Sequence, residues 1–189
     1  EPISAEQLHQ FAECFRQVNF DDKTFMPCYG LAENALAVSF SDEACGVVVN
    51  EVDRDILEYQ GKAVTPGAET RAVSTFVNCG KALPEHGIEI RNEAGMPVAE
   101  RVVGHICISG PSLMSGYFGD QISQDEIAAT GWLDTGDLGY LLDGYLYVTG
   151  RIKDLIIIRG RNIWPQDIEY IAEQEPEIHS GDAIAFVTA

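Results

Sequence analysis

Apolar residues recur at helical spacing near the start of the chain. Residues 4–18 carry one apolar face, and Ser4 precedes it as an N-cap with Gln7 three residues later, as in a capping box. The residues of that face are Leu8, Phe11, Ala12, Phe15 and Val18. We therefore expect an amphipathic helix over residues 4–18.

Further along, the apolar residues form short runs bounded by turn residues, which is typical of strands. The expected strands cover residues 25–29, 35–40, 47–52, 73–77, 88–90, 102–109, 152–158 and 183–187. Asp143-Gly144 separates two more apolar runs and indicates a tight hairpin. Helices are expected at residues 123–128 and from Pro165, a residue suited to the first helical turn. The predicted fold class is α+β, strand-rich in the middle and mixed at the end.

Residues 53–71 differ from their surroundings. Asp53-Arg54-Asp55, Gly61-Lys62 and Thr65-Pro66-Gly67 are polar or turn-prone. We interpret this stretch as an insertion or a long loop.

The charge of the chain excludes some partners. Thirty acidic residues stand against 12 basic ones, and the resulting formal charge of −18 disfavours binding to nucleic-acid phosphates and to anionic lipid. Four of the bases lie close together, at Arg151, Lys153, Arg159 and Arg161. This cluster is compatible with an anion site and equally with a solvated loop.

The cysteines argue against a disulfide framework and a zinc site, because they are odd in number and lack C-x-x-C spacing. They are Cys14, Cys28, Cys45, Cys79 and Cys107. No apolar run has the length of a membrane span. We expect reduced, mostly buried thiols in a cytoplasmic protein.

One short segment, Tyr29-Gly30-Leu31-Ala32-Glu33, offers groups suited to a nucleotide. Tyr29 has an aromatic face for a base, and Gly30 leaves room for a close approach. Glu33 supplies hard carboxylate oxygens of the kind that Mg²⁺ prefers. The plainer reading is a core tyrosine followed by a solvated carboxylate.

Two later segments carry complementary groups. In residues 131–139, Asp137 can accept two hydrogen bonds, as vicinal ribose hydroxyls would require. In residues 150–154, Arg151 has a permanent charge and a planar donor fork, and the run 159–165 follows closely. An Asx turn and a basic surface turn are the plainer alternatives.

Together and in this order, these segments resemble the adenylate-forming superfamily of acyl-CoA synthetases, luciferases and peptide-synthetase adenylation domains. Residues 104–117 resemble a further family segment. The resemblance implies a fragment of the large N-terminal adenylating domain, with a β-rich, distorted barrel-like subdomain, and the start of a small α+β C-terminal domain. The implied divisions are residues 1–76, with the insertion at about 53–71, then 77–150 and 151–189.

The resemblance also implies residue roles. The implied ATP- or AMP-binding residues are Tyr29, Gly30, Glu33, Asp137 and Arg151. Adenine stacking falls to Tyr29, Mg²⁺ coordination to Glu33, ribose binding to Asp137, and ribose or phosphate contacts to Arg151. Lys153 matches the hinge on which the C-terminal domain swings. His105 follows Gly104 where many relatives have Glu, and we expect it to be structural.

Two features resemble the fatty acyl-AMP ligases within this superfamily. Ala32 stands where many relatives have Thr, and the insertion follows Val52, where ordinary acyl-CoA synthetases are shorter. In that subfamily the insertion is held to restrain the domain swing that CoA chemistry needs. The implied reaction converts a fatty acid and Mg-ATP to acyl-adenylate and pyrophosphate, after which an acyl carrier protein thiol accepts the acyl group. A fatty acyl-CoA synthetase and a non-catalytic nucleotide- or carrier-protein-binding module are the alternatives.

The family's phosphate loop and late lysine have no counterpart in this sequence. No catalytic residue is therefore assigned within it, and the lysine is expected downstream. We expect negligible adenylation activity from the chain alone.

Overall fold

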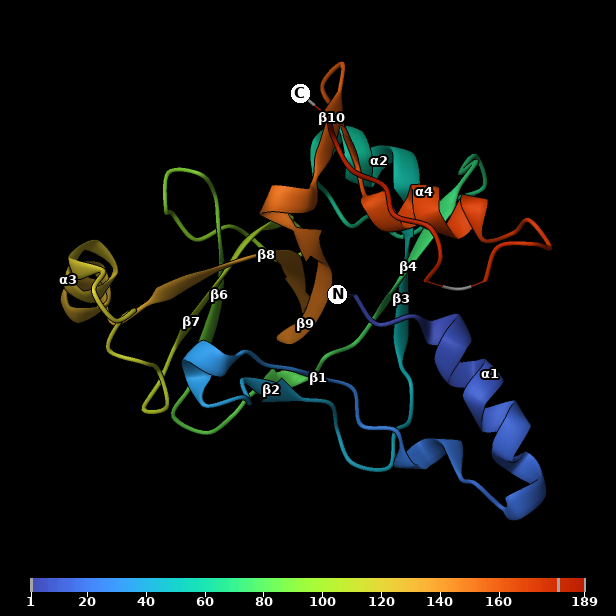
Figure 1. The fold of residues 1–189 in the computed structure, drawn as a ribbon, viewed down its shortest axis with the longest axis horizontal. Helices are drawn as coiled ribbons and strands as arrows, with labels where there is room; N and C mark the ends of the chain where they lie inside the picture. Colours follow the sequence, from blue (N-terminus) through green and yellow to red (C-terminus); the bar gives the residue numbers. More distant parts are fainter. Residues whose placement is uncertain (1, 180, 189) are drawn as a thin grey trace.

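The N-terminal helix forms where the sequence predicts it. The structure, a computed structural model, describes residues 2–179 and 181–188, without the side chains of residues 122 and 123 (Figure 1). Helix α1 (Ala5–Phe15) is capped by the Ser4 hydroxyl, which accepts a hydrogen bond from the Gln7 N–H at 3.3 Å. A 3₁₀ turn, η1 (Arg16–Val18), extends it. The apolar face gathers an aromatic cluster of Phe11, Phe15, Phe20 and Phe25.

The largest sheet has four antiparallel strands in the order β6-β7-β8-β9. They are β6 (Gly87–Arg91), β7 (Gly104–Ser109), β8 (Leu133–Leu142) and β9 (Tyr145–Arg151). The predicted hairpin at Asp143-Gly144 joins β8 to β9, and both turn residues have positive φ, as a tight turn of this kind requires. Among the described residues the sheet stays open at β6 and β9, so no closed barrel forms.

Three smaller antiparallel sheets surround it (Figure 1). One contains β1 (Cys28–Tyr29), β2 (Ser39–Phe40) and β5 (Lys81–Ala82), one pairs β3 (Val49–Asp53) with β4 (Val73–Val77), and one pairs β10 (Ile156–Ile158) with β11 (Arg161–Ile163). The remaining elements are η2 (Asp22–Thr24), η3 (Ala32–Asn34), α2 (Arg54–Gln60), α3 (Gln121–Thr130), η4 (Ile152–Asp154) and α4 (Pro165–Ala172).

Four predicted strands were wrong in part or whole, and of these the runs 25–29 and 35–40 are strands only at their last two residues, β1 and β2. The run 152–158 begins with the 3₁₀ turn η4, closed by the Leu155 N–H donating to the Ile152 carbonyl, so only its end is a strand. Within the described part of residues 183–187 there is no strand, and most of these side chains are exposed. A terminal apolar run forms a strand only where a partner strand supplies its backbone hydrogen bonds.

The stretch 53–71, the predicted insertion, connects the paired strands β3 and β4 and contains the helix α2, so it is not wholly a loop. Asp53 and Val73 are partners in the β3–β4 ladder, so the ends of the insertion are held side by side. Asp53 also caps α2, since its carboxylate accepts from the Ile56 N–H at 3.0 Å. Hydrogen bonds from Thr70 and from Ile56 lower the pKa of Asp53.

Two hydrophobic clusters form the core. One lies under the four-stranded sheet, and its buried members are Tyr29, Val38, Cys79, Ile90, Ile106, Ile108 and Leu146. The other joins the insertion to the β8–β9 hairpin through Val52, Leu57, Ala63, Phe76, Tyr140 and Tyr147. Each cluster draws side chains from both sides of the implied boundary at residues 76 and 77, so these two parts share their core.

The thiols are free, but the expectation that most are buried was wrong. Cys79 and Cys107 are buried, whereas Cys14, Cys28 and Cys45 are exposed. Burial raises the pKa of both buried thiols to about 11. Across the described residues, none of the helices has the length and hydropathy needed to cross a bilayer.

Candidate functional site

Asp137 is the centre of a polar group built from three distant segments. Its Oδ2 accepts a hydrogen bond from the Tyr29 hydroxyl at 2.7 Å, and its Oδ1 accepts from the Arg151 Nε at 3.1 Å. Asp137 and Arg151 are partners across the β8–β9 ladder, and Tyr29 ends the short strand β1. The structure thus brings together three of the residues that the sequence predicts to bind a nucleotide.

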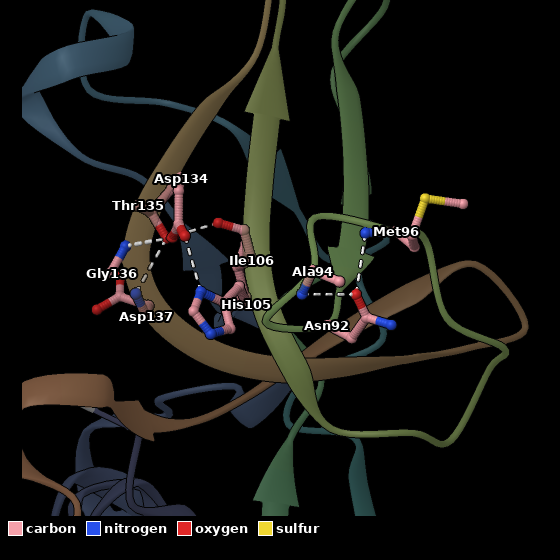
Figure 2. Close-up of polar contacts among 9 residues, drawn as sticks. All are labelled: Asn92, Ala94, Met96, His105, Ile106, Asp134, Thr135, Gly136 and Asp137. Atoms are coloured by element: carbon pink, nitrogen blue, oxygen red, sulfur yellow. Dashed lines mark hydrogen bonds and ion pairs between the residues drawn. The ribbon is translucent and has the colours of Figure 1, made fainter. Parts of the chain in front are cut away.

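A bulge in β8 presents the Asp137 carboxylate. In the β7–β8 ladder His105 pairs with Leu138 and Cys107 pairs with Asp134, so residues 135–137 stand opposite Ile106 alone. The Thr135 hydroxyl lies 2.9 Å from the Ile106 carbonyl and 3.2 Å from the Asp137 N–H, which pins the bulge on both sides (Figure 2). Such bulges re-aim side chains and are frequent beside active sites.

Gly136 allows this bulge to form. Its φ is +75°, a left-handed conformation that costs other residues free energy, and a Cβ there would meet nothing within 4 Å. Its N–H donates to the Asp134 Oδ1 at 3.0 Å (Figure 2). The conformation, and not lack of space, explains a glycine at this position.

The Tyr29 ring is part of the core, with 8% of its surface exposed. Burial, with a further contribution from Asp137, raises the pKa of the Tyr29 phenol well above its usual range. The phenol therefore stays protonated and donates to Asp137 at any working pH. Stacking of this ring on adenine remains a prediction, since only a small part of the ring faces outward.

Gly30 has a reason of its own. A Cβ on this residue would lie 1.7 Å from the Leu36 carbonyl oxygen, so the returning backbone fills the space that a side chain needs. The chain folds back here through η3, with Ala35 and Leu36 at positive φ. The expected close approach of a nucleotide to Gly30 is still a prediction, but the turn itself demands the glycine.

Glu33 lies in η3, and its side chain is held by a residue that sequence reasoning did not find. The Tyr117 hydroxyl donates to the Glu33 Oε1 at 2.7 Å, and the Met114 N–H donates to the Glu33 backbone carbonyl at 2.8 Å. The loop after β7 therefore fixes the segment that carries the predicted metal ligand. No group of three or more metal-ligating side chains occurs in the part of the chain that the structure describes.

Two of the four clustered bases pair with different carboxylates. Arg151 pairs with Asp137, whereas Arg161 pairs through its Nε with the Glu58 carboxylate, whose side chain is 3% exposed. Lys153 is exposed and lies in η4. Arg151 is both the last residue of β9 and the N-cap of η4. Arg151 and Arg161 are therefore held by separate carboxylates and not by one shared group.

Helix α2 of the insertion contacts the C-terminal segment. Besides the Glu58 pair, Arg161 lies 3.9 Å from Asp55, and Arg54 lies 3.6 Å from Asp167. Burial raises the pKa of Asp167, and the charge of Arg54 opposes that shift. In Figure 1, α2 lies beside α4 and the paired strands β10 and β11, and these ion pairs connect it to β11 and α4.

Comparison with known proteins assigns a family to this geometry. The sequence signature described as AMP-binding enzyme matches residues 1–118, more than half of the chain. The chain belongs to the AMP-binding enzyme family. The chain is 44% identical to a putative acyl-CoA synthetase of Caulobacter vibrioides, and the match covers 97% of the chain and 32% of that relative.

Two further similarities are informative. The medium-chain fatty acid–acyl carrier protein ligase JamA of Moorena producens is 35% identical over 98% of the chain and 33% of the relative. A solved structure from a study of fatty acyl-adenylate ligases from E. coli and L. pneumophila is 98% identical, with a TM-score of 0.98, over the whole chain and 34% of that protein. The AMP-binding chain thus spans about a third of the proteins it matches.

The residues that sequence reasoning missed are partners of those it found. Tyr117, Thr135 and Glu58 each act through a contact with a residue far along the chain, at Glu33, Ile106 and Arg161. Spacing gives no signal for such contacts. Only the position of Thr135 beside the Gly136 bulge offered a local hint.

Proposed function

We propose that this chain serves in a fatty acyl-AMP ligase. The reaction joins a fatty-acid carboxylate oxygen to the α-phosphorus of ATP as the bond to pyrophosphate breaks, and an acyl carrier protein thiol then takes the acyl group as AMP and a proton leave. The observation that carries the proposal is the convergence of Tyr29 and Arg151 on Asp137 in a member of the AMP-binding family.

Asp137 holds the ribose in this proposal. Each of its oxygens already accepts one hydrogen bond and keeps a further lone pair for a hydroxyl donor. Tyr29 and Arg151 fix the carboxylate plane from two sides, so little rotamer freedom is lost when a nucleotide binds. The exposed Arg151 guanidinium also leaves donors available to a phosphate or ribose oxygen.

Glu33 is suited to Mg²⁺ as one ligand among several. Mg²⁺ in nucleotide sites is usually bound by one or two carboxylates together with phosphates and water, so a single glutamate fits that chemistry. When bound, the ion would neutralise charge on the triphosphate as pyrophosphate leaves. Tyr117 orients Glu33 by holding Oε1, which leaves Oε2 for the ion.

The contacts of α2 favour a carrier-protein thiol over CoA as the acceptor. Glu58 and Arg54 tie the insertion to Arg161 and Asp167, on the far side of the proposed hinge at Lys153. Any swing about Lys153 must break these pairs, and it would leave Glu58 buried without its partner. JamA, by its name, acylates a carrier protein. The rival, a fatty acyl-CoA synthetase, draws support from the Caulobacter relative.

The first experiment tests nucleotide binding in the intact protein. Asp137→Ala should weaken AMP binding at least about tenfold, because even one lost charged hydrogen bond is worth about 1.5 kcal/mol. Isothermal titration with AMP measures this directly. Unchanged affinity would reject the proposed site and would favour the non-catalytic module, if carrier-protein binding persists.

The second experiment tests the acceptor. The intact protein is supplied with ATP, labelled fatty acid, and either CoA or a phosphopantetheinylated carrier protein. We expect the rate of carrier-protein acylation to exceed the rate of CoA thioester formation. In the double variant Arg54→Ala, Glu58→Ala, the difference between these two rates should be smaller. Efficient CoA thioester formation by the unaltered protein would establish the rival. We also propose a cytoplasmic location, a division at residue 151 before the C-terminal domain, and negligible adenylation by the chain alone.

A further inference from the structure

His105 lies on β7 directly behind the bulge that presents Asp137. Its Nδ1 is 2.7 Å from the Asp134 Oδ2, and the two side chains are 26% and 47% exposed. An ionised carboxylate only accepts hydrogen bonds, so the Nδ1 carries a proton and donates it. In Figure 2 the imidazole ring points at the Asp134 carboxylate from the neighbouring strand.

Asp134 connects His105 to the bulge through its two carboxylate oxygens. While Oδ2 accepts from His105, Oδ1 accepts from the Gly136 N–H at 3.0 Å. Gly136 has the left-handed conformation, and its N–H is held by this hydrogen bond. The Asp134 carboxylate thus fixes the outer edge of the bulge, while Thr135 fixes its inner edge on the Ile106 carbonyl.

We propose that His105 is a positioning residue for nucleotide binding, acting through Asp134 and Gly136 on Asp137. This inference rests on the proposed function, because it gives His105 a role only if Asp137 holds a ribose. The chain His105–Asp134–Gly136 sets the backbone of the residue just before Asp137, and a three-residue bulge opposite a single residue has few ladder hydrogen bonds of its own. His105 touches no substrate and does no chemistry.

The test uses the intact protein and AMP as the probe. His105→Leu removes the donor and should weaken AMP binding about threefold to fivefold, the upper part of the range for a partly exposed pair. His105→Asn places an amide N–H near the position of Nδ1 and should recover most of the affinity. The KM for ATP should rise in the leucine variant while kcat changes little, since ribose contacts are made equally in the ground and transition states.

A matched control lies in the turn after β6, a strand of the same sheet. Asn92 pins the turn after β6, its Oδ1 accepting from the Ala94 and Met96 N–H groups, both at 3.0 Å (Figure 2). Asn92→Ala removes two exposed side-chain contacts without touching the bulge, so it should leave AMP affinity unchanged. If His105→Leu fails to fold, His105→Gln moves the donor out of reach of Asp134 and should show the same loss.

The outcomes separate the two proposals. If Asp137→Ala weakens AMP binding but His105→Leu and His105→Gln do not, the positioning role is wrong and the proposed function stands. An equal loss in Asn92→Ala would also refute it, because the effect would then be general destabilisation of the sheet. If Asp137→Ala itself binds AMP normally, the proposed function fails and the role of His105 fails with it.

Discussion

Replacing Tyr29 by phenylalanine separates two roles for this residue. The substitution keeps the buried ring and deletes only the hydroxyl that donates to Asp137 at 2.7 Å. If the ring stacks on adenine, the variant should bind nucleotide normally. If the hydroxyl orients Asp137, binding should weaken.

The expected size follows from rotamer freedom. Without the Tyr29 hydroxyl, Arg151 is the one side chain among the described residues with a hydrogen bond to the carboxylate, and it is 64% exposed. Release of the carboxylate from one rotamer to about three costs about 0.65 kcal/mol on binding, or about a threefold loss of affinity. This is well below the loss of at least about tenfold expected for Asp137→Ala, since the acceptor oxygens remain.

The assay compares AMP titrations of the intact protein and its variants. Tyr140→Phe is the matched control, because its buried hydroxyl also donates to a side-chain oxygen, that of Asn50 at 2.8 Å. Both variants should lose about 1 kcal/mol of stability, but only Tyr29→Phe should lose affinity. Normal affinity in Tyr29→Phe, or an equal loss in Tyr140→Phe, would refute the positioning argument.

Three other expectations can be checked in the intact protein. Burial raises the pKa of Tyr140 above its unfolded value of 10.0, so the unfolded state loses this proton first and the free energy of unfolding falls as the pH rises above 10. In Tyr140→Phe, the free energy of unfolding measured with urea should fall less steeply above pH 10, by about 1.4 kcal/mol per pH unit. Gly30→Ala should yield no folded protein, whereas Gly136→Ala should fold, lose about 1 kcal/mol in the same measurement and bind AMP more weakly. Cys79 and Cys107 should resist alkylation at pH 8 until unfolding, as peptide mass spectrometry would show, and rapid labelling of either would contradict their burial.

Helix α2, in the insertion, could not be predicted from the pattern of apolar residues. Asp53 is a common type of N-cap residue and caps α2. In this helix, however, Leu57 is the one apolar side chain that is fully buried. Helical periodicity needs several apolar positions, so this short helix is invisible to it. By contrast, α1 and α4 have a clear cap or a leading proline together with apolar spacing, and both helices form where they were predicted. The prediction that α4 turns Ile168 and Ile171 inward was wrong, because both side chains are exposed.

The strand register at the site could also not be predicted from the sequence. The hairpin turn sets pairs such as Tyr140 with Tyr147, and a regular ladder would place Asp137 opposite Gly150. A shift between Leu138 and Gly139 moves Arg151 into that place instead. The sequence supports a hairpin that brings these segments together, but the irregularity that creates the Asp137–Arg151 pair depends on tertiary packing.

The position of Arg151 at the very end of β9 has a consequence for how an intermediate is kept. Tyr29, Asp137 and Arg151 all precede Lys153, so rotation at the proposed hinge would move the downstream part and leave the proposed ribose site in place. In the proposed ligase, holding the acyl-adenylate and turning the C-terminal part would then be mechanically separate. The α2 ion pairs would oppose that turn, so we expect substitutions there to change it without weakening nucleotide binding.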